Sequence, residues 1–165
     1  MNRIVTVTAC GLALALASGR GSVVAQQGAS TSSHVMSTPT ELKWGEAPPS
    51  LPKGAKLVVL SGDPGKAGPF AVRLRIPAGY RIAPHWHPTD EHVTVVSGTF
   101  SMAMGEKFDA KALKTLPTGG YAMMPAEARH YAMTRGGATV QVHGTGPFVL
   151  NYVNPADDPS KAAAK

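Results

Sequence analysis

The 165-residue sequence predicts a single all-β domain, and three observations support this prediction. Short segments rich in β-branched and aromatic residues recur along the chain, as in the alternation F-A-V-R-L-R-I at 70–76. Glycine and proline interrupt these segments at nearly regular intervals, which is typical of an antiparallel sandwich or barrel. Only Asp109–Leu113 has the composition of a helical turn.

The expected strands follow one another from Lys56 onward. Lys56–Leu60 is apolar and ends at the turn sequence S-G-D-P-G, and Phe70–Ile76 alternates up to the turn P-A-G. Later segments with strand composition between turns are Arg81–His87, His92–Val96, Phe100–Met104, Tyr121–Met124, Arg129–Met133, Thr139–His143 and Phe148–Val153. Together the strands define a domain over residues 53–153.

The segments on either side of this domain have a different composition. Residues 26–52 are rich in Ser, Thr, Gly, Ala and Pro, so we expect a flexible leader, with Leu42 and Trp44 as candidates for contact with the domain. Residues 154–165 are similarly polar and predict a disordered tail.

The first 25 residues have the features of an export signal. Arg3 supplies a positive charge, residues 4–17 are apolar and uncharged, and the small residues V-V-A precede a cleavage site near Ala25. The apolar run is too short for a membrane-spanning helix, and the lack of an Arg-Arg pair favours Sec export. We therefore expect a periplasmic or secreted protein. The alternative is a cytosolic protein with an apolar N-terminus.

Cys10 is the only cysteine and lies inside this signal. The sequence V-T-A-C at 7–10 resembles a lipoprotein cleavage box, so a lipid anchor at Cys10 is an alternative. Fewer apolar residues would then precede the cut than a signal usually has. A chain cut near Ala25 has no thiol, so packing and any bound metal must stabilise it.

The charge pattern argues against nucleic-acid binding. The chain has 16 basic and 10 acidic residues, a net charge of +6, and removal of Arg3 and Arg20 with the signal lowers this to about +4. The remaining basic residues are scattered, and no basic run alternates with stacking aromatic residues.

One stretch concentrates side chains that bind metal ions. In G-Y-R-I-A-P-H-W-H-P-T-D-E-H-V-T-V-V-S-G, His85 and His87 are two residues apart, so on a strand both point to the same face. The turn sequence P-T-D predicts that Glu91 returns opposite them, and His130 follows on a later strand. Three imidazoles and one carboxylate suit Fe, Mn, Ni, Cu, Co or Zn as a divalent ion. Histidines that lie on a strand surface by chance are the alternative.

The chain resembles a small single-domain, metal-binding cupin of the RmlC-like kind. The first cupin motif is matched at every spacing by Gly79, His85, His87, Glu91 and Gly98. The second is matched by Gly119, Pro125 and His130, whereas Glu127 and Thr134 stand where the motif has Gly and Asn. These two departures concern turn geometry and the end of a strand rather than ligands. The resemblance covers Lys56 to Val153.

This resemblance implies a double-stranded β-helix, or jelly-roll barrel, with one metal ion inside a mouth of the barrel. It implies His85, His87, Glu91 and His130 as the ligands, and a possible homodimer. Glu91 is also the candidate catalytic residue, because a carboxylate that leaves the metal can act as a base. Cupins include enzymes and non-catalytic proteins, so the fold alone does not choose the function.

Several further residues are candidates for lining a substrate pocket: Arg81, Phe100, Met102, Gln141 and His143. A regular strand would place Arg81 on the face of His85, where it would bind a substrate carboxylate. Gln141 and His143 share a face and would hydrogen-bond a metal-bound ligand. Core packing is the alternative for Phe100 and Met102, and surface exposure is the alternative for the polar residues.

Three functions remain open from the sequence. The first is a metal-dependent enzyme acting on a small organic molecule, either by dioxygenase-like chemistry or by proton transfer as a lyase or isomerase. The second is a non-catalytic periplasmic module that binds metal or a small ligand. The third is a structural jelly roll without metal. An enzyme requires an open cavity beside the metal, whereas a binding module permits a closed one.

Overall fold

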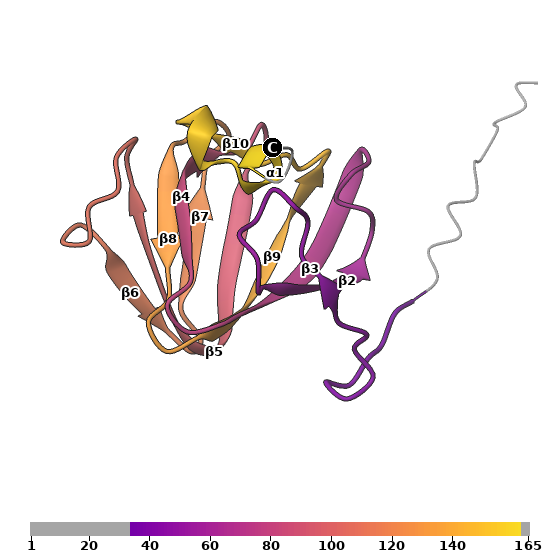
Figure 1. Ribbon diagram of the computed structural model, residues 1–165. Coiled ribbons are helices and arrows are strands. Elements are labelled where there is room, and N and C mark those ends of the chain that lie inside the picture. Colours follow the sequence, from indigo (N-terminus) through magenta and orange to yellow (C-terminus); the bar gives the residue numbers. More distant parts are fainter. Residues whose placement is uncertain (1–33, 163–165) are drawn as a thin grey trace, which may run out of the picture. The chain divides into compact units, whose positions relative to one another are not determined.

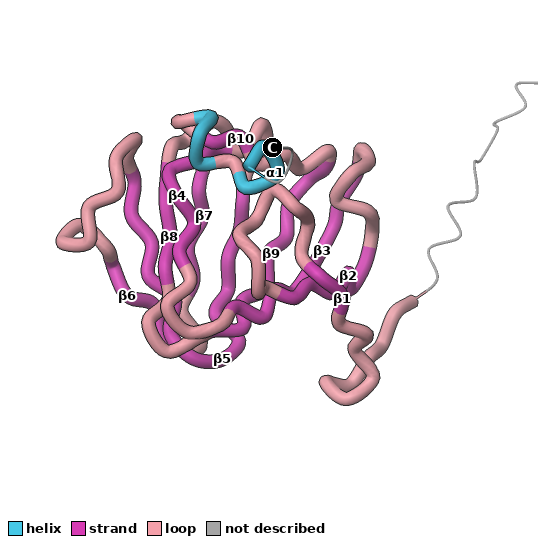
Figure 2. The backbone as a smooth tube through the Cα atoms, in the orientation of Figure 1, coloured by secondary structure: helices cyan, strands magenta, loops and turns pink. Residues whose placement is uncertain are grey.

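The computed structural model describes residues 34–162, which form one compact unit whose regular secondary structure is almost entirely strand (Figures 1 and 2). The predicted export signal and Cys10 lie outside the described residues. The strands are β1 (Gly45–Glu46), β2 (Lys56–Ser61), β3 (Gly68–Ile76), β4 (Arg81–Trp86), β5 (Glu91–Met104), β6 (Lys114–Pro117), β7 (Tyr121–Met124), β8 (His130–Met133), β9 (Ala138–Gly146) and β10 (Asn151–Tyr152).

All strand pairs are antiparallel, and the long strand β5 joins two curled layers. Its first half pairs with β9 and β7, and β9 continues through β3 and β2 to β1. We call this layer sheet A. Its second half pairs with β6 and β8, and β8 continues through β4 to β10. We call this layer sheet B. The all-β prediction is confirmed.

Strand β5 crosses from one sheet to the other at Gly98. Gly98 has φ +77°, which favours glycine, and a Cβ atom there would collide with the carbonyl oxygen of Gly137. A register shift between Val95 and Ser97 adds a β-bulge just before this corner. The sequence predicted two separate strands here, His92–Val96 and Phe100–Met104. They form one strand because the glycine bends the chain without interrupting its pairing.

The core lies between the two sheets and follows the alternation of the strands. On β5 the side chains of Val93, Val95, Phe100 and Met102 are buried, and on β9 Val140 and Val142 are buried. The residues between them are polar or less buried and lie on the outer faces. The apolar set of each strand therefore decides which face points inward.

Three segments differ from the expectation. β6 was not predicted, because its K-T-L-P sequence is short and contains one buried residue, Leu116. Asp109–Leu113 forms a turn, closed by a 3.2 Å hydrogen bond from the amide of Ala112 to the carbonyl of Asp109, rather than a helix. Phe148–Val153 contains strand pairing only at β10.

Both flanking segments contain local structure. Within 26–52, β1 pairs with β2, and Trp44 lies beneath the guanidinium of Arg75 at 4.2 Å from the ring centroid. Within 154–165, the 3-10 helix η1 (Pro155–Asp157) and the short helix α1 (Pro159–Ala162) follow each other. Asn154 stabilises η1 by accepting a hydrogen bond from the amide of Ala156. No helix within residues 34–162 is long and apolar enough to cross a membrane.

Candidate metal centre

A β-bulge in β4 aims His85 into the core. Ile82 pairs with Ala132 and His85 pairs with His130, so β4 has one more residue between these pairs than β8 has. Ile82 and His85 would lie on opposite faces of a regular strand. The bulge turns both inward, and His85 is only 3% exposed.

His87 follows β4 and is held by the C-terminal part of the chain. Its Nδ1 lies 2.8 Å from the carbonyl oxygen of Val149, and its ring stacks on Phe148 at a centroid distance of 4.1 Å and an angle of 16°. Neither Phe148 nor Val149 was predicted as part of the site. Phe148 is an aromatic residue near other apolar residues, so no sequence signal distinguished it from a core residue.

The turn before His130 also contacts His87. Glu127, which stands where the cupin motif has glycine, adopts φ 62° and donates its amide hydrogen to the carbonyl of His87 at 2.7 Å. The left-handed conformation costs a non-glycine residue roughly 1–2 kcal/mol. At the other departure, Thr134 is buried and its hydroxyl accepts a hydrogen bond from the amide of Gly137. Both substituted positions thus keep the turns that the motif requires.

The three inner histidines have a common arrangement of their ring nitrogens. Nδ1 of His85 contacts the carbonyl of Ala83 at 2.7 Å, and Nδ1 of His130 contacts the carbonyl of Ala128 at 2.9 Å. A carbonyl oxygen only accepts, so each Nδ1, including that of His87, donates its hydrogen. In the neutral ring Nε2 then carries the free lone pair. Backbone carbonyls hold metal-binding histidines in this way.

The free nitrogens converge with the carboxylate of Glu91. One ligand atom from each of His85, His87 and His130 lies within 4.8 Å of the others, so the three buried side chains could hold a metal ion. Glu91 Oε2 lies 3.2 Å from His130 Nε2, and Oε1 lies 3.8 Å from His87 Nε2. We call these four residues the inner cluster.

Several atoms of the inner cluster are buried without a hydrogen bond within the described residues. They are Nε2 of His87, Nε2 of His130 and Oε2 of Glu91. Unsatisfied buried polar atoms are rare, and each costs roughly 1–3 kcal/mol. Because all of them are electron-pair donors pointing at one place, a cation satisfies them together.

Burial favours the neutral forms of His85 and His87. Desolvation, followed by the neighbouring imidazoles of His130 and His87, lowers the pKa of His85 to about 3. Desolvation also lowers the pKa of His87. Burial alone would raise the pKa of Glu91, but His130, His87 and His85 together lower it. At neutral pH the cluster therefore offers neutral imidazoles at His85 and His87 and an ionised carboxylate at Glu91, which are the forms that bind metals.

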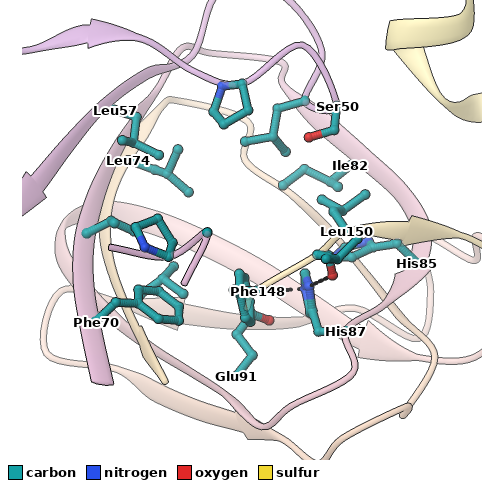
Figure 3. A pocket seen from close by; sticks show the side chains of 17 residues that line it. Ser50, Leu57, Phe70, Leu74, Ile82, His85, His87, Glu91, Phe148 and Leu150 are labelled. Carbon is teal, nitrogen blue, oxygen red and sulfur yellow. Dashed lines mark hydrogen bonds and ion pairs between the residues drawn. The ribbon is translucent and has the colours of Figure 1, made fainter. Parts of the chain in front are cut away.

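An apolar cavity of about 400 Å³ opens beside the inner cluster. In Figure 3, Leu57, Leu74 and Phe70 line one wall, whereas His85 and His87 lie on the other and Glu91 lies at the end away from Ser50. The remaining lining residues are mostly proline, valine, isoleucine and leucine, together with Phe148. The cavity is thus an apolar chamber with its polar groups gathered at one place.

Part of the predicted leader forms the far side of this cavity. Pro48, Ser50 and Leu51 line it. Two tyrosine hydroxyls hold this segment: Tyr152 donates to the carbonyl of Ser50 at 2.8 Å, and Tyr80 donates to the carbonyl of Pro52. Sequence composition did not reveal this role, because the anchoring groups come from distant parts of the chain.

The predicted pocket residues divide into two groups. Phe100 and Met102 are buried in the core and line a smaller cavity of about 30 Å³ next to His85, Glu91 and His130, but they do not line the large cavity. The other three, Arg81, Gln141 and His143, lie outside both cavities.

The placement of Arg81, Gln141 and His143 in the pocket was wrong. The bulge in β4 reverses the face of Arg81 relative to His85, and its guanidinium lies over the ring of Phe108 at 3.5 Å. On β9 the buried residues Ala138, Val140 and Val142 alternate with Thr139, Gln141 and His143, so Gln141 and His143 point outward. Gln141 accepts a hydrogen bond from Arg73 Nε at 3.1 Å.

Solved structures of similar fold support the jelly-roll prediction. A candidate acetylacetone dioxygenase from Methylibium petroleiphilum is 20% identical, with a TM-score of 0.59, and the match covers 80% of this chain and 94% of the other. The polyketide cyclase RemF from Streptomyces resistomycificus is 14% identical, with a TM-score of 0.59, and covers 81% and 94%. An RmlC-like cupin from Shewanella frigidimarina is 18% identical, with a TM-score of 0.54, and covers 68% and 91%.

These structures share the fold, and their identities are too low to transfer an activity. No curated protein matches the sequence. A family model does match it: the ChrR cupin-like domain, over residues 32–149, which is more than half of the chain. The protein is therefore a cupin and belongs to the family of ChrR cupin-like domains.

Proposed function

We propose that the protein is a metal-dependent enzyme that oxygenates a small, neutral, largely apolar molecule, with O₂ as the oxidant. The observation that carries this proposal is the position of the inner cluster at one end of an apolar cavity of about 400 Å³. Among the described lining residues there is no lysine or arginine. A carboxylate substrate would lose its hydration there without gaining a cationic partner, so a neutral substrate is favoured.

The inner cluster is proposed to hold one divalent ion through His85, His87, His130 and Glu91. The mixed nitrogen and oxygen donors suit Fe, Mn, Ni, Cu, Co or Zn. A redox-active ion held there would supply Lewis-acid chemistry and electron transfer to O₂. The Nδ1 contacts hold the imidazoles in place, and the apolar walls exclude water from the cavity.

Glu91 is proposed as the base. Its carboxylate is buried at the end of the cavity, where it can accept a proton from a carbon next to a substrate carbonyl. The lining residues within the described chain include no lysine, tyrosine or second carboxylate that could take this role. Glu91 thus has two proposed functions, as a ligand and as a proton acceptor.

Two proteins of similar fold support the proposal of a neutral substrate. One of the solved structures is named as a candidate acetylacetone dioxygenase and another as a polyketide cyclase. Acetylacetone is a neutral diketone that chelates through two oxygen atoms. A small diketone therefore matches both the uncharged walls and the donor set, and we propose this substrate class for the oxygenase.

Oxygen uptake tests the proposal. The protein is loaded with each of the six metals in turn and offered 2,4-pentanedione as a neutral chelating probe or pyruvate as an anionic one. We expect uptake with a redox-active metal and the neutral probe. Glu91→Gln should abolish turnover and keep much of the metal, whereas Glu106→Gln, at an exposed position, should change neither. Equal loss of metal and turnover in Glu91→Gln would make Glu91 only a ligand.

A non-catalytic binding module is the second candidate. It is favoured by the leader segment, which two tyrosine hydroxyls hold across the cavity, and by the lack of a lysine, tyrosine or second carboxylate on the described walls. A binding module would bind metal and neutral ligands without O₂ uptake. A lyase or isomerase would instead exchange substrate hydrogen for deuterium in D₂O without consuming O₂.

We further propose export to the periplasm or beyond the cell, on the basis of the charged and apolar N-terminal sequence. Mass measurement of the mature chain after native expression tests it. Cleavage near Ala25 would support the proposal, and an intact N-terminus would contradict it. The homodimer remains a prediction.

A further inference from the structure

A second group of histidines lies on the outer face of sheet A. His92 on β5 and His143 on β9 are cross-strand partners, and their rings stack with a centroid distance of 4.8 Å and an angle of 9°. His92 directly follows Glu91, so the alternation of the strand sends its side chain away from the inner cluster. We call His92 and His143 the outer pair.

The ring nitrogens of the outer pair are incompletely satisfied. His92 Nδ1 lies 2.7 Å from the hydroxyl of Tyr121, which leaves Nε2 for another partner. His143 Nδ1 is buried and has no hydrogen-bond partner within residues 34–162. A buried nitrogen without a partner costs roughly 1–3 kcal/mol. A ligand that accepts the lone pairs of both rings removes this cost.

A thioether extends the outer pair into a row. Met123 on β7 is the cross-strand partner of His92 on the other side and is 46% exposed. The row from His143 through His92 to Met123 therefore contains two imidazoles and one sulfur. The nearest strand positions on β7 and β9 carry no carboxylate, and Ca²⁺ and Mg²⁺ require oxygen ligands. Imidazole donors suit copper, zinc, iron and nickel, and the thioether adds a preference for the soft ion Cu(I).

We propose that His92 and His143 form a second transition-metal site, which prefers copper, with Met123 as an additional ligand for Cu(I). Antiparallel partners have Cβ atoms about 5 Å apart, a separation from which two imidazoles reach one ion after rotation about their side-chain torsions. The contact with the Tyr121 hydroxyl orients the His92 ring, and in the tautomer in which Nδ1 donates to that hydroxyl, Nε2 carries the lone pair for the metal. This site is independent of the proposed oxygenase activity and is expected to bind more weakly than the inner cluster, because it is half-exposed and has fewer ligands.

Equilibrium dialysis of the full chain against Cu(II) tests the site. The protein retains the metal with which it was purified, and both metals are counted. We expect about one added copper with no loss of the resident metal, and nitrogen coupling in the electron paramagnetic resonance spectrum. Copper that only replaces the resident metal would overturn the proposal, because the ion would then occupy the inner cluster.

Phenylalanine variants separate the ligand role from packing. His92→Phe and His143→Phe keep a stacked ring and remove the nitrogens, so each should weaken copper binding at least tenfold while the melting temperature changes little. His34→Phe removes an exposed histidine outside the row and should have no effect. Unchanged copper affinity in the His92→Phe/His143→Phe double variant would overturn the site.

Met123→Leu tests the third ligand. We expect it to weaken Cu(I) binding several-fold and to leave Cu(II) binding nearly unchanged, because a thioether prefers the softer ion. Equal affinity of this variant and the parent protein for Cu(I) would contradict the role of Met123.

Discussion

The inner cluster and the outer pair lie on opposite sides of sheet A. Glu91 belongs to the inner cluster, and His92, the next residue of β5, belongs to the outer pair. The two sites differ in what holds their ring nitrogens. Backbone carbonyls hold every inner Nδ1, whereas a half-exposed tyrosine hydroxyl contacts His92 and no residue of the described chain hydrogen-bonds Nδ1 of His143. A carbonyl fixed in a sheet or turn cannot rotate away, so the inner rings are oriented before any ion binds.

Burial strengthens this difference. The inner histidines are 1–3% exposed, so their lone pairs have no water to compensate for a missing cation, and the outer pair remains partly hydrated. The same residue type can therefore give a strong preorganised site on one face and a weaker, adjustable site on the other. The following predictions test whether a change at one site alters metal binding at the other.

Gly98→Ala should break both sites at once and has the largest expected effect. The new Cβ would collide with the carbonyl of Gly137 in a left-handed conformation, so the free energy of unfolding should fall by about 4 kcal/mol. Gly79→Ala is the matched control, because it has a similar φ and open space around it. It should cost only about 1–2 kcal/mol. Urea unfolding compares them, and equal losses would show that the corner is not critical.

His130→Ala should break the inner cluster alone. It removes one imidazole and leaves the buried carboxylate of Glu91 without its nearest partner. We expect metal affinity to fall by roughly 100-fold or more. Substitution of residues that only orient a metal ligand already lowers affinity by up to about 100-fold, and His130 is itself a proposed ligand. Competition with a chelator measures this affinity. The variant should still take up copper at the outer pair, and loss of both ions would show that the two sites are coupled.

Acidification should destabilise the metal-free protein through the inner cluster. The pKa of His85 is about 3 in the folded chain and about 6.5 when unfolded. The unfolded chain therefore binds more protons between these values, so stability is complete above pH 6.5 and is lost as the pH falls toward 3. His85 alone should contribute a loss of about 2 kcal/mol from pH 7 to pH 5.

Thermal unfolding of chelator-treated protein at the two pH values measures this loss. His85→Asn should reduce it clearly, and His34→Asn should leave it unchanged. A loss of the same size in His85→Asn would assign the pH dependence to other groups.

Phe148→Leu should lower metal affinity by a smaller amount. It tests how much the stacked ring of Phe148 contributes to the inner cluster. The stacked ring supports His87, and an aromatic contact contributes about 0.5–1.5 kcal/mol, so metal affinity should fall about two- to tenfold. Phe108→Leu, which removes a ring that packs on Tyr131 and Arg81 away from the cluster, should leave metal affinity unchanged. Equal effects of the two variants would indicate a general loss of packing rather than support of His87.

The inner cluster was accessible from the sequence because short-range rules determine most of it. Two histidines two residues apart, a turn and a glutamate need only the alternation of a strand to predict that they converge. The strand boundaries were less accessible. Two predicted segments proved to be the single strand β5, because a glycine at a corner has the same sequence signal as a glycine in a loop.

The pocket was less predictable, for three different reasons. Gln141 and His143 were placed on the wrong face of β9. The sequence did contain the signal, because the apolar residues Val140 and Val142 alternate with them and identify the buried face. Arg81 was misplaced because of a β-bulge in β4 between Ile82 and His85. Pro84 lies in this bulge, and a proline within a strand is a signal of such irregular pairing that the regular alternation ignored. The walls formed by Phe148 and the segment near Ser50 depend on tertiary contacts between distant parts of the chain, which local patterns do not encode.

The contact between His87 and Val149 has a consequence for the order of assembly. These residues are 62 positions apart, so the carbonyl that orients His87 arrives only when the last part of the domain has docked. During synthesis from the N-terminus, a chain that ends before Val149 already contains every ligand of the inner cluster but cannot hold one of them in place. We therefore expect tight metal capture to be among the last events of maturation, so that a nascent chain does not trap an ion before its barrel has closed.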